Sequence, residues 1–268
     1  MQHEPDRVAN FFVHRSAAQR YAAARPYFHP QVIRRIVATT QCHRFNRAVD
    51  IACGTGQSSR ALADIANRVD AIDISWEMLS EATPHPRIAR HVAAAENLPF
   101  ADNSFELATV GLAFHWFDQA AFLNEAKRVL EPGGWLVIYT SGFDGEMREN
   151  AEFQHWALEV YRERFPPPPR RSWGVSAEFA KSVGFSLIAQ EHFAHQKIMT
   201  AQQLTGYLLT QTNVIAAVES GNTPLADAAA WIMEGVRPFF RNPAGTLTFT
   251  GTIWFLRRTC RGTDAATT

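Results

Sequence analysis

The segment Ala48–Gly56, with the sequence AVDIACGTG, constrains the fold more than any other part of this 268-residue chain. Its apolar run, residues 48–52, is too short for a helix and suits a buried parallel strand. Gly54 and Gly56 then follow in a tight turn, where glycine permits a positive φ or a close backbone approach that a Cβ would prevent. The sequence therefore predicts a strand that runs into a loop lying flush against a bound ligand.

Apolar runs and helical patterns alternate along the first half of the chain. Strands are predicted at residues 48–52, 68–72, 88–93, 105–110 and 135–140. Helices are predicted at residues 15–25, 30–40, 57–66, 76–82 and 118–130. Ser75 is the expected N-cap of the helix over 76–82. Strands that alternate with helices imply an α/β fold with a parallel, doubly wound sheet.

The second half departs from this alternation. A predicted helix over residues 153–164 ends at four prolines, Pro166 to Pro169, which form a stiff extended spacer. Another helix is expected at 176–183. Long strands at 185–199 and 246–256 enclose predicted helices at 201–209 and 224–240. The small, polar tail after Arg261 is expected to fray.

The charge and cysteine content narrow the class of protein. Lysine and arginine number 26, as do aspartate and glutamate, so no overall field favours nucleic acid or an anionic membrane. The first residues, MQHEPDRV, lack an apolar signal region, and no apolar run approaches membrane-spanning length. Three cysteines without a CxxC spacing argue against a disulfide framework or zinc site. A soluble, cytoplasmic protein is expected, without a metal.

Further signals follow the glycine loop in a fixed order. They are an acid after the second strand (Asp73), an acidic-Leu-Pro-Phe stretch (residues 96–100), His115-Trp116 after a strand, and LEPGG at residues 130–134. The series resembles the class I S-adenosylmethionine-dependent methyltransferases, specifically their small-molecule branch with a methyltransferase type 11 domain, similar to trans-aconitate methyltransferase. The resemblance covers residues 10 to 140 well and the remainder loosely.

The resemblance implies a doubly wound, mostly parallel, seven-stranded sheet with an inserted helical cap. Residues 1–45 would form N-terminal helices over the cofactor, 46–200 the cofactor-binding α/β core, 201–243 the cap, and 244–268 the final strand and tail. The implied cofactor is S-adenosyl-L-methionine. A small-molecule acceptor is expected, with no nucleic acid or membrane partner, in a monomer or homodimer.

Several residues match the positions that bind the cofactor in this family. The glycine loop, Ala52 to Gly56, would lie along the methionine moiety, with Ala52 where the family usually has glycine. Asp73 would accept both ribose hydroxyls, because two carboxylate oxygens match a vicinal diol. Asp50 would help position the ammonium, or would simply cap the loop. The remaining matches, each with packing or solvation as the alternative, are Tyr21, Ile74, Met78, Ala95 and Glu96.

A dinucleotide-binding fold is the competing interpretation of the glycine loop. Residues 54–59 are one residue short of GxGxxG, whose third glycine allows close packing of helix on strand. Ser59 breaks that motif, and the LPF and PGG segments have no place in it.

Methyl transfer from a sulfonium is an in-line displacement in which the protein supplies alignment and desolvation. His115 is the candidate catalytic base or hydrogen-bond donor, and sheet-edge packing is its alternative. Arg25 would hold a carboxylate, or form a surface ion pair. By resemblance, Trp116 would shape the acceptor pocket. Three cap residues would direct polar groups toward the acceptor, or would be buried in the core: Tyr207, Thr210 and Asn213.

A small-molecule O-methyltransferase acting on a carboxylate is therefore the leading hypothesis. Phenols, amines and carbon acceptors come next. A cofactor-binding protein without catalysis is a further alternative, as is an enzyme acting on RNA or protein.

Overall fold

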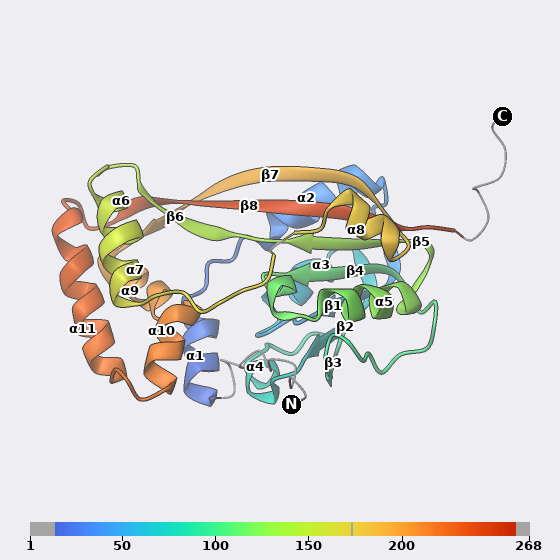
Figure 1. Cartoon of the computed structure of the whole chain (residues 1–268), viewed down its shortest axis with the longest axis horizontal. Helices are drawn as coiled ribbons and strands as arrows, with labels where there is room; N and C mark the ends of the chain where they lie inside the picture. The colour runs from blue at the N-terminus through green and yellow to red at the C-terminus, as the bar shows by residue number, and fades with distance from the viewer. Residues whose placement is uncertain (1–13, 173, 261–268) are drawn as a thin grey trace, which may run out of the picture.

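The computed structural model describes residues 14–172 and 174–260. The expectations for the first residues and for the tail after Arg261 lie outside these residues. The centre of the described chain is an eight-stranded sheet with the order β3-β2-β1-β4-β5-β8-β6, in which β7 also pairs with β8 (Figure 1). Its parallel strands are β1 (Phe45–Ile51), β2 (Ala66–Asp73), β3 (Ile88–Val92), β4 (Phe105–Gly111) and β5 (Leu130–Tyr139).

The sheet has eight strands where seven were expected, and the additional strand belongs to its antiparallel part. β5 pairs with residues 253–257 of β8 (Gly245–Arg258), and β6 (Gly142–Met147) pairs with residues 247–250 of the same strand. Thr140 and Ser141 interrupt what would otherwise be one long strand. β7 (Phe185–Met199) pairs along the whole opposite edge of β8.

Helices cover both faces of the parallel strands, as in a doubly wound fold. Successive strand residues alternate between two apolar clusters. Ala48 and Leu107 belong to the cluster that includes α2 (His29–Thr40), whereas Val49 and Ala108 belong to the one that includes α5 (Gln119–Val129). The other helices beside the sheet are α3 (Gln57–Leu62), α4 (Trp76–Ser80) and α8 (Ala177–Ser182).

Local capping fixes where several helices begin. The Ser75 hydroxyl accepts the backbone N–H of Met78, as expected for an N-cap. The Asp118 carboxylate accepts the N–H of Ala121 and starts α5. Thr200 and Gln203 form a capping box at the start of α9 (Ala201–Leu208).

A group of helices forms a cap at one end of the molecule (Figure 1). It combines α9, α10 (Thr212–Glu219) and α11 (Leu225–Val236) with the helical turns over residues 153–164, and one apolar cluster joins them. α10 has no helical signal in the sequence, because its first four residues, Thr212 to Ile215, are weak helix formers. All four are buried, so tertiary packing selects the helix.

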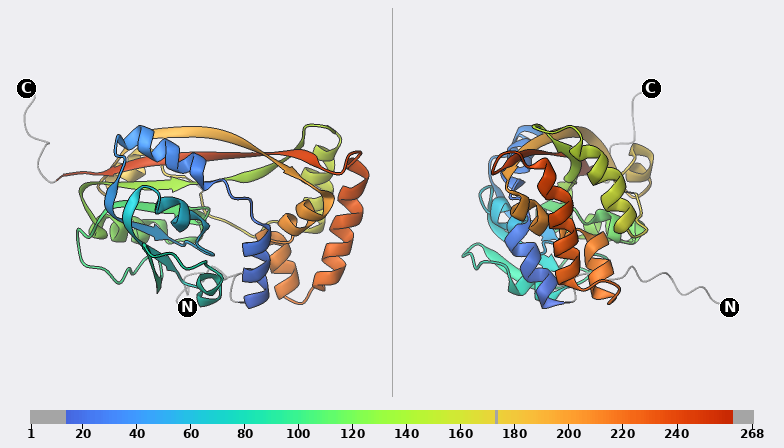
Figure 2. Two further views of the ribbon diagram at one scale, coloured as in Figure 1. Left: turned by 180° about the vertical axis from the view of Figure 1, so that it is seen from behind. Right: turned by 90° about the vertical axis from the view of Figure 1, so that its left-hand side faces the viewer.

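The N-terminal helix α1 (Arg15–Ala24) lies between the cap and the core (Figure 2). It contacts α9 on one side and α4 on the other. Arg20 Nη2 lies 3.1 Å from Glu219 Oε1 of α10, and Arg15 Nε lies 3.7 Å from Glu81 Oε1 beside α4. Ion pairs therefore attach this helix to both parts of the protein.

Candidate functional site

The loop after β1 has the backbone that its glycines predict. Ala52, Gly54 and Gly56 have φ of 55°, 56° and 78°. A Cβ on Gly56 would lie 2.9 Å from the Cβ of Ala82, and one on Gly54 would lie 3.1 Å from Met78 Cε. The positive φ favours glycine at both positions, and at Gly56 the space beside Ala82 excludes a Cβ as well.

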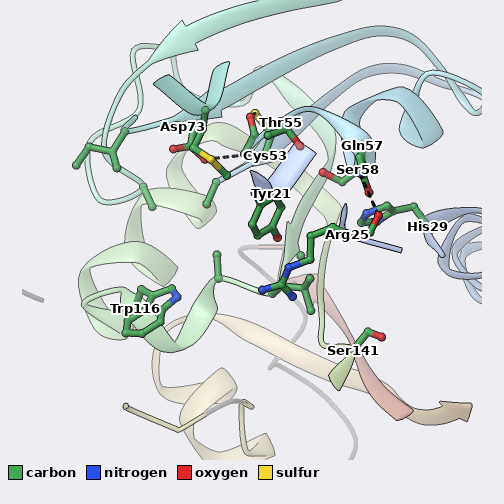
Figure 3. A pocket seen from close by; sticks show the side chains of 18 of the residues that line it. Tyr21, Arg25, His29, Cys53, Thr55, Gln57, Ser58, Asp73, Trp116 and Ser141 are labelled. Atoms are coloured by element: carbon green, nitrogen blue, oxygen red, sulfur yellow. Dashed lines mark hydrogen bonds between the residues drawn. The ribbon is translucent and has the colours of Figure 1, made fainter. Parts of the chain in front are cut away.

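This loop borders the main cavity, which lies at the carboxyl ends of the parallel strands (Figure 3). Ligands of open α/β sheets bind at that edge. Most of the residues expected to bind the cofactor line it, namely Tyr21, Ala52, Gly54, Asp73, Ile74, Met78, Ala95 and Glu96. Gly56 and Asp50 do not.

Asp73 ends β2 with its carboxylate in the main cavity. Oδ2 accepts the N–H of Gly54 at 2.8 Å, and Oδ1 accepts the N–H of Ser75 at 2.9 Å. Burial raises the pKa of this carboxyl, while these backbone hydrogen bonds act in the opposite direction. Each oxygen keeps a further lone pair, so the group can accept two hydroxyls of a diol.

Asp50 is not among the lining residues of the main cavity, so its help in positioning the ammonium, through water or through the loop, stays a prediction. Its side chain is fully buried and accepts hydrogen bonds from Ser58, Ser59 and Thr109 at 2.6, 2.6 and 2.8 Å. Burial raises its pKa, and the three hydroxyls oppose that shift. Asp50 thus joins α3 and β4 to β1, which is the capping role in a different form.

A hydrogen-bonded chain links this buried acid to a cavity residue that sequence reasoning missed. Ser58 bonds the Tyr139 hydroxyl, which lies 3.1 Å from Nδ1 of His29, a lining residue of the main cavity. His29 is 7 % exposed, and burial lowers its pKa to about 3. The sequence carries no local signal for this link, since 110 positions separate His29 from Tyr139.

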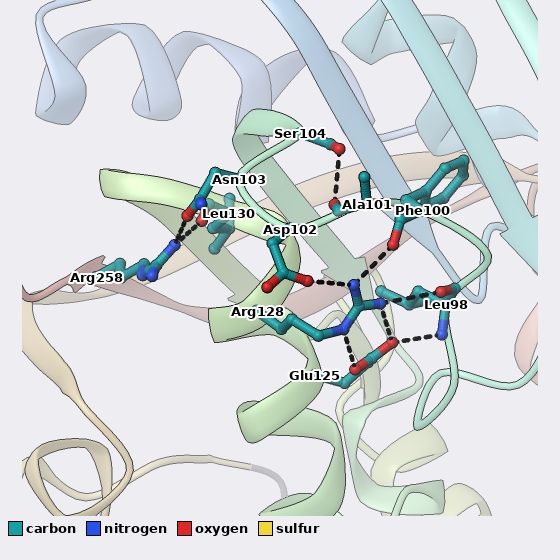
Figure 4. A network of polar contacts seen from close by, with 10 residues as sticks. All are labelled: Leu98, Phe100, Ala101, Asp102, Asn103, Ser104, Glu125, Arg128, Leu130 and Arg258. Atoms are coloured by element: carbon teal, nitrogen blue, oxygen red, sulfur yellow. Dashed lines mark hydrogen bonds and ion pairs between the residues drawn. The ribbon is translucent and has the colours of Figure 1, made fainter.

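The acidic-Leu-Pro-Phe stretch is held by Arg128 of α5 (Figure 4). The guanidinium donates to the carbonyls of Phe100 and Leu98 at 2.7 and 3.1 Å, and it pairs with Glu125 at 2.6 Å. Glu125 also accepts the N–H of Leu98 at 2.7 Å. This network positions the loop that presents Ala95 and Glu96 to the main cavity. Glu96 itself accepts the N–H of Asp118.

A second cavity, the cap chamber, lies between the carboxyl edge of the sheet and the cap. It shares six residues with the main cavity: Tyr21, Arg25, Leu112, Trp116, Ser141 and Tyr207. Leu112 has a left-handed backbone with φ of 62°, an uncommon conformation for a non-glycine residue. The two cavities are therefore neighbours with a shared boundary, and both lie beside the end of β4.

His115 lies in the cap chamber and does not line the main cavity. It follows β4 in a short 3-10 turn (Phe114–Trp116), with its ring centroid 4.4 Å from that of Trp116. Burial, followed by the charge of Arg170, lowers the pKa of His115 to about 3. The imidazole is neutral at physiological pH, but so low a pKa makes it a weak base.

Of the three cap residues expected near the acceptor, two line a cavity and one does not. Tyr207 lines both cavities, and Asn213 lines the cap chamber while donating to the Phe165 carbonyl at 2.8 Å. Thr210 lines neither cavity. Its buried hydroxyl donates to the Tyr207 carbonyl at 2.6 Å, and its own carbonyl accepts from Arg25 at 2.7 Å. The side chain of Thr210 is therefore core, as the alternative reading had it.

Among the described residues, no group of histidine, cysteine, aspartate and glutamate side chains could hold a metal ion. In the same part of the chain, no helix is both apolar enough and long enough to cross a membrane.

These features fit S-adenosylmethionine. A glycine loop lies flush against the main cavity, the carboxylate of Asp73 can take a ribose diol, and the ring of Tyr21 can face a sulfonium cation. The sheet order, with parallel strands β3-β2-β1-β4-β5 and an antiparallel β8 beside β5, is compatible with the same cofactor.

Comparisons with known proteins agree with this assignment. Residues 49–138 match the family model described as a methyltransferase domain. A malonyl-[acyl-carrier protein] O-methyltransferase of Enterobacter lignolyticus is 33 % identical over 144 residues, 50 % of this chain and 57 % of the relative. The chain spans 56 to 67 % of the length of the first curated relatives it matches.

Solved structures extend the likeness to most of the chain. A candidate type II methyltransferase from Anaeromyxobacter dehalogenans has a TM-score of 0.67 and 26 % identity, covering 88 % of this chain and 97 % of that one. A Haemonchus contortus phosphoethanolamine N-methyltransferase, solved with S-adenosylhomocysteine, shares the fold at a TM-score of 0.55 and 18 % identity, covering 94 % of this chain and 61 % of that one. Residues 49–138 thus match a methyltransferase domain, and most of the chain shares its fold with solved methyltransferases.

Proposed function

We propose that this protein transfers a methyl group from S-adenosylmethionine to a carboxylate oxygen of a small molecule. The observation that carries the proposal is the charge of the cap chamber. Arg25, Arg162 and Arg170 line it, and no aspartate or glutamate is among its described lining residues. A cavity that gathers cations without acids attracts an anionic acceptor.

Arg25 is the arginine nearest to the point where the two cavities join. One Nη donates to the Thr210 carbonyl at 2.7 Å, and the guanidinium carbon lies 4.6 Å from the ring centre of Tyr21 and 5.3 Å from that of Tyr207. Its Nε is buried without a hydrogen-bond partner in the described structure. A guanidinium has five N–H donors, so a carboxylate in the chamber would accept from Nη hydrogens that Thr210 does not take.

Arg170 supports the same interpretation from the other side of the chamber. Its guanidinium lies 5.4 Å above the ring of Trp116 and donates to the Thr212 hydroxyl. Burial, and then the charge of Arg25, lowers the pKa of Arg170. Two mutually repelling cations around one space are stabilised when an anion enters it.

The titration of the lining histidines also favours an acceptor that is already ionised. The pKa values of His29 and His115 are lowered to about 3, and that of His195 to about 4. Moving a proton from a phenol to a base of pKa about 3 costs about 9 kcal/mol, given 1.36 kcal/mol per unit. A carboxylate needs no base. When bound, the cofactor supplies an activated methyl group, and the protein's own task is to align the acceptor and exclude water.

The name of one relative, malonyl-[acyl-carrier protein] O-methyltransferase, is compatible with methylation of a carboxylate oxygen. N-, C- and phenol O-methylation, and cofactor binding without catalysis, are the alternatives that the experiment must separate.

The test is transfer of labelled methyl from S-adenosylmethionine to a panel of aliphatic and aromatic mono- and dicarboxylic acids, phenols and amines. Mild base should release the label as methanol, since methyl esters hydrolyse. Base-stable label would contradict the carboxylate assignment, and tight S-adenosylhomocysteine binding without label on any acceptor would favour the non-catalytic alternative.

A variant pair refines this test. Arg25→Gln should raise the KM for the acceptor acid at least tenfold and leave the Kd for S-adenosylhomocysteine within about threefold. Arg34→Gln, on the exposed face of α2, is the matched control and should change neither. A large loss of S-adenosylhomocysteine affinity with an unchanged acceptor KM would move Arg25 to the cofactor site.

A further inference from the structure

Ser141 occupies the point where the main cavity and the cap chamber join. It belongs to the six residues that line both, and it is the one that comes from the break between β5 and β6. Its side chain is half-buried and lies below Arg25 in the view of Figure 3. A hydroxyl at the junction can contact an acceptor that reaches from the chamber toward the cofactor.

His195 of β7 holds the Ser141 hydroxyl in place. Its Nε2 lies 3.0 Å from Ser141 Oγ, and its side chain is 6 % exposed. The imidazole is sandwiched between two rings, with Phe28 at 5.3 Å and an interplanar angle of 9°, and Phe249 at 5.1 Å and 11°. The stack fixes the plane of the imidazole, and the hydrogen bond holds Nε2 on Ser141 within that plane.

We propose that Ser141 and His195 form a positioning pair for the acceptor carboxylate. The His195 Nε2–H donates to Ser141 Oγ, and the Ser141 hydroxyl donates to the carboxylate oxygen that does not receive the methyl group. The proposal rests on the function proposed above.

The charge of the acceptor decides the direction of these hydrogen bonds. If Ser141 donated to His195, it would turn only lone pairs toward an anion, which is unfavourable. An Nε2–H imidazole occupies one lone pair of Oγ and leaves the O–H for the ligand. No proton is transferred in this arrangement, because the carboxylate is already ionised. Ser141 thus fixes one oxygen and Arg25 balances the charge.

The experiment compares Ser141→Ala, Ser141→Thr, His195→Phe and the double variant Ser141→Ala/His195→Phe. Phenylalanine keeps the ring stack while removing Nε2. The assay uses the best carboxylic acid from the panel and measures kcat, KM and the Kd for S-adenosylhomocysteine. The matched control is His192→Phe, since His192 lies on the same strand and also contacts a hydroxyl, Thr252 Oγ1, at 3.0 Å, but is exposed.

Ser141→Ala and His195→Phe should each lower kcat/KM at least tenfold, with the Kd for S-adenosylhomocysteine within twofold of wild type. The double variant should lose no more than the worse single variant, because the two residues act as one unit. Ser141→Thr should recover most of the activity, and His192→Phe should match wild type.

Three results would overturn the pair: unchanged kcat/KM in Ser141→Ala, multiplicative losses in the double variant, or no recovery in a folded Ser141→Thr. Circular dichroism and the thermal midpoint establish folding. These failures are distinct from failure of the proposed function. Base-stable product from the wild type overturns the carboxylate assignment, whereas base-labile product with unaltered Ser141→Ala kinetics overturns the pair alone.

Discussion

The buried imidazole of His29 should make the protein sensitive to acid by a calculable amount. Its ring stacks on Phe28 at 4.4 Å, and Nδ1 contacts the Tyr139 hydroxyl. Burial, followed by the charge of His195, lowers its pKa from 6.5 to about 3. Below pH 6.5 the unfolded chain takes up a proton that the folded chain refuses, so stability falls as the pH drops from about 6.5 toward 3. At pH 4.5 the loss is about 2.7 kcal/mol, from roughly two pH units at 1.36 kcal/mol each.

The variant His29→Phe tests this reasoning. It keeps an aromatic ring on Phe28 but loses the hydrogen bond to Tyr139, which should cost about 1 kcal/mol at pH 7.5. It also removes the acid penalty, so at pH 4.5 it should exceed wild type in stability by about 1.7 kcal/mol. The two stability curves should therefore cross near pH ~6.

Urea unfolding followed by tryptophan fluorescence between pH 7.5 and 4.5 measures both curves. The control His43→Phe, at an exposed histidine, should stay parallel to wild type. A constant free-energy difference between His29→Phe and wild type over the whole range would refute the argument, because it would mean that folded His29 takes up its proton as readily as the unfolded chain does.

Three further predictions concern the cofactor site. Asp73→Asn should weaken S-adenosylhomocysteine binding by about 1–3 kcal/mol in calorimetry, since a charged acceptor is lost; unchanged affinity would remove Asp73 from the site. Ala52→Gly should stabilise the protein by about 1 kcal/mol in urea unfolding, because alanine here has φ of 55°; a destabilised variant would contradict this. Arg128→Met should destabilise the protein by roughly 1–3 kcal/mol and weaken S-adenosylhomocysteine binding severalfold, because the Leu98 and Phe100 carbonyls lose their donor. Unchanged binding would show that the loop keeps its conformation without Arg128.

Local sequence signals predicted the elements that build the cofactor site. The glycine turn, the Ser75 cap and the order of strands and helices each depend on neighbouring residues, and the structure has all three. The doubly wound sheet was confirmed with them. The predicted strand at 135–140 ended at this break, but β6 was missed, because its sequence GFDGEM has no β-branched residue and the strand arises from pairing with β8.

The site residues that escaped prediction depend on contacts between distant parts of the chain. Ser141 and His195 lie 54 positions apart, and neither stands in a recognisable motif. The three hydroxyls that enclose Asp50 also come from separate elements, Ser58 and Ser59 of α3 and Thr109 of β4. The pairing of Arg25 with the Thr210 carbonyl likewise spans 185 positions. Spacing cannot reveal such contacts, because folding alone brings these residues together.

The pairing of β7 with β8 has a consequence for how the specificity of this protein can change. Met199, the last residue of β7, is directly opposite Gly245, the first residue of β8, so the 45 residues between them leave and re-enter the sheet at adjacent points. A segment whose ends meet can be exchanged for one of another length with little change in chain-closure entropy. Asp73, the glycine loop and the Arg128 network all lie outside it. The fold can thus alter the wall of the cap chamber that Leu208, Gln211 and Asn213 form by replacing one continuous stretch of chain, while Asp73 and the glycine loop stay as they are.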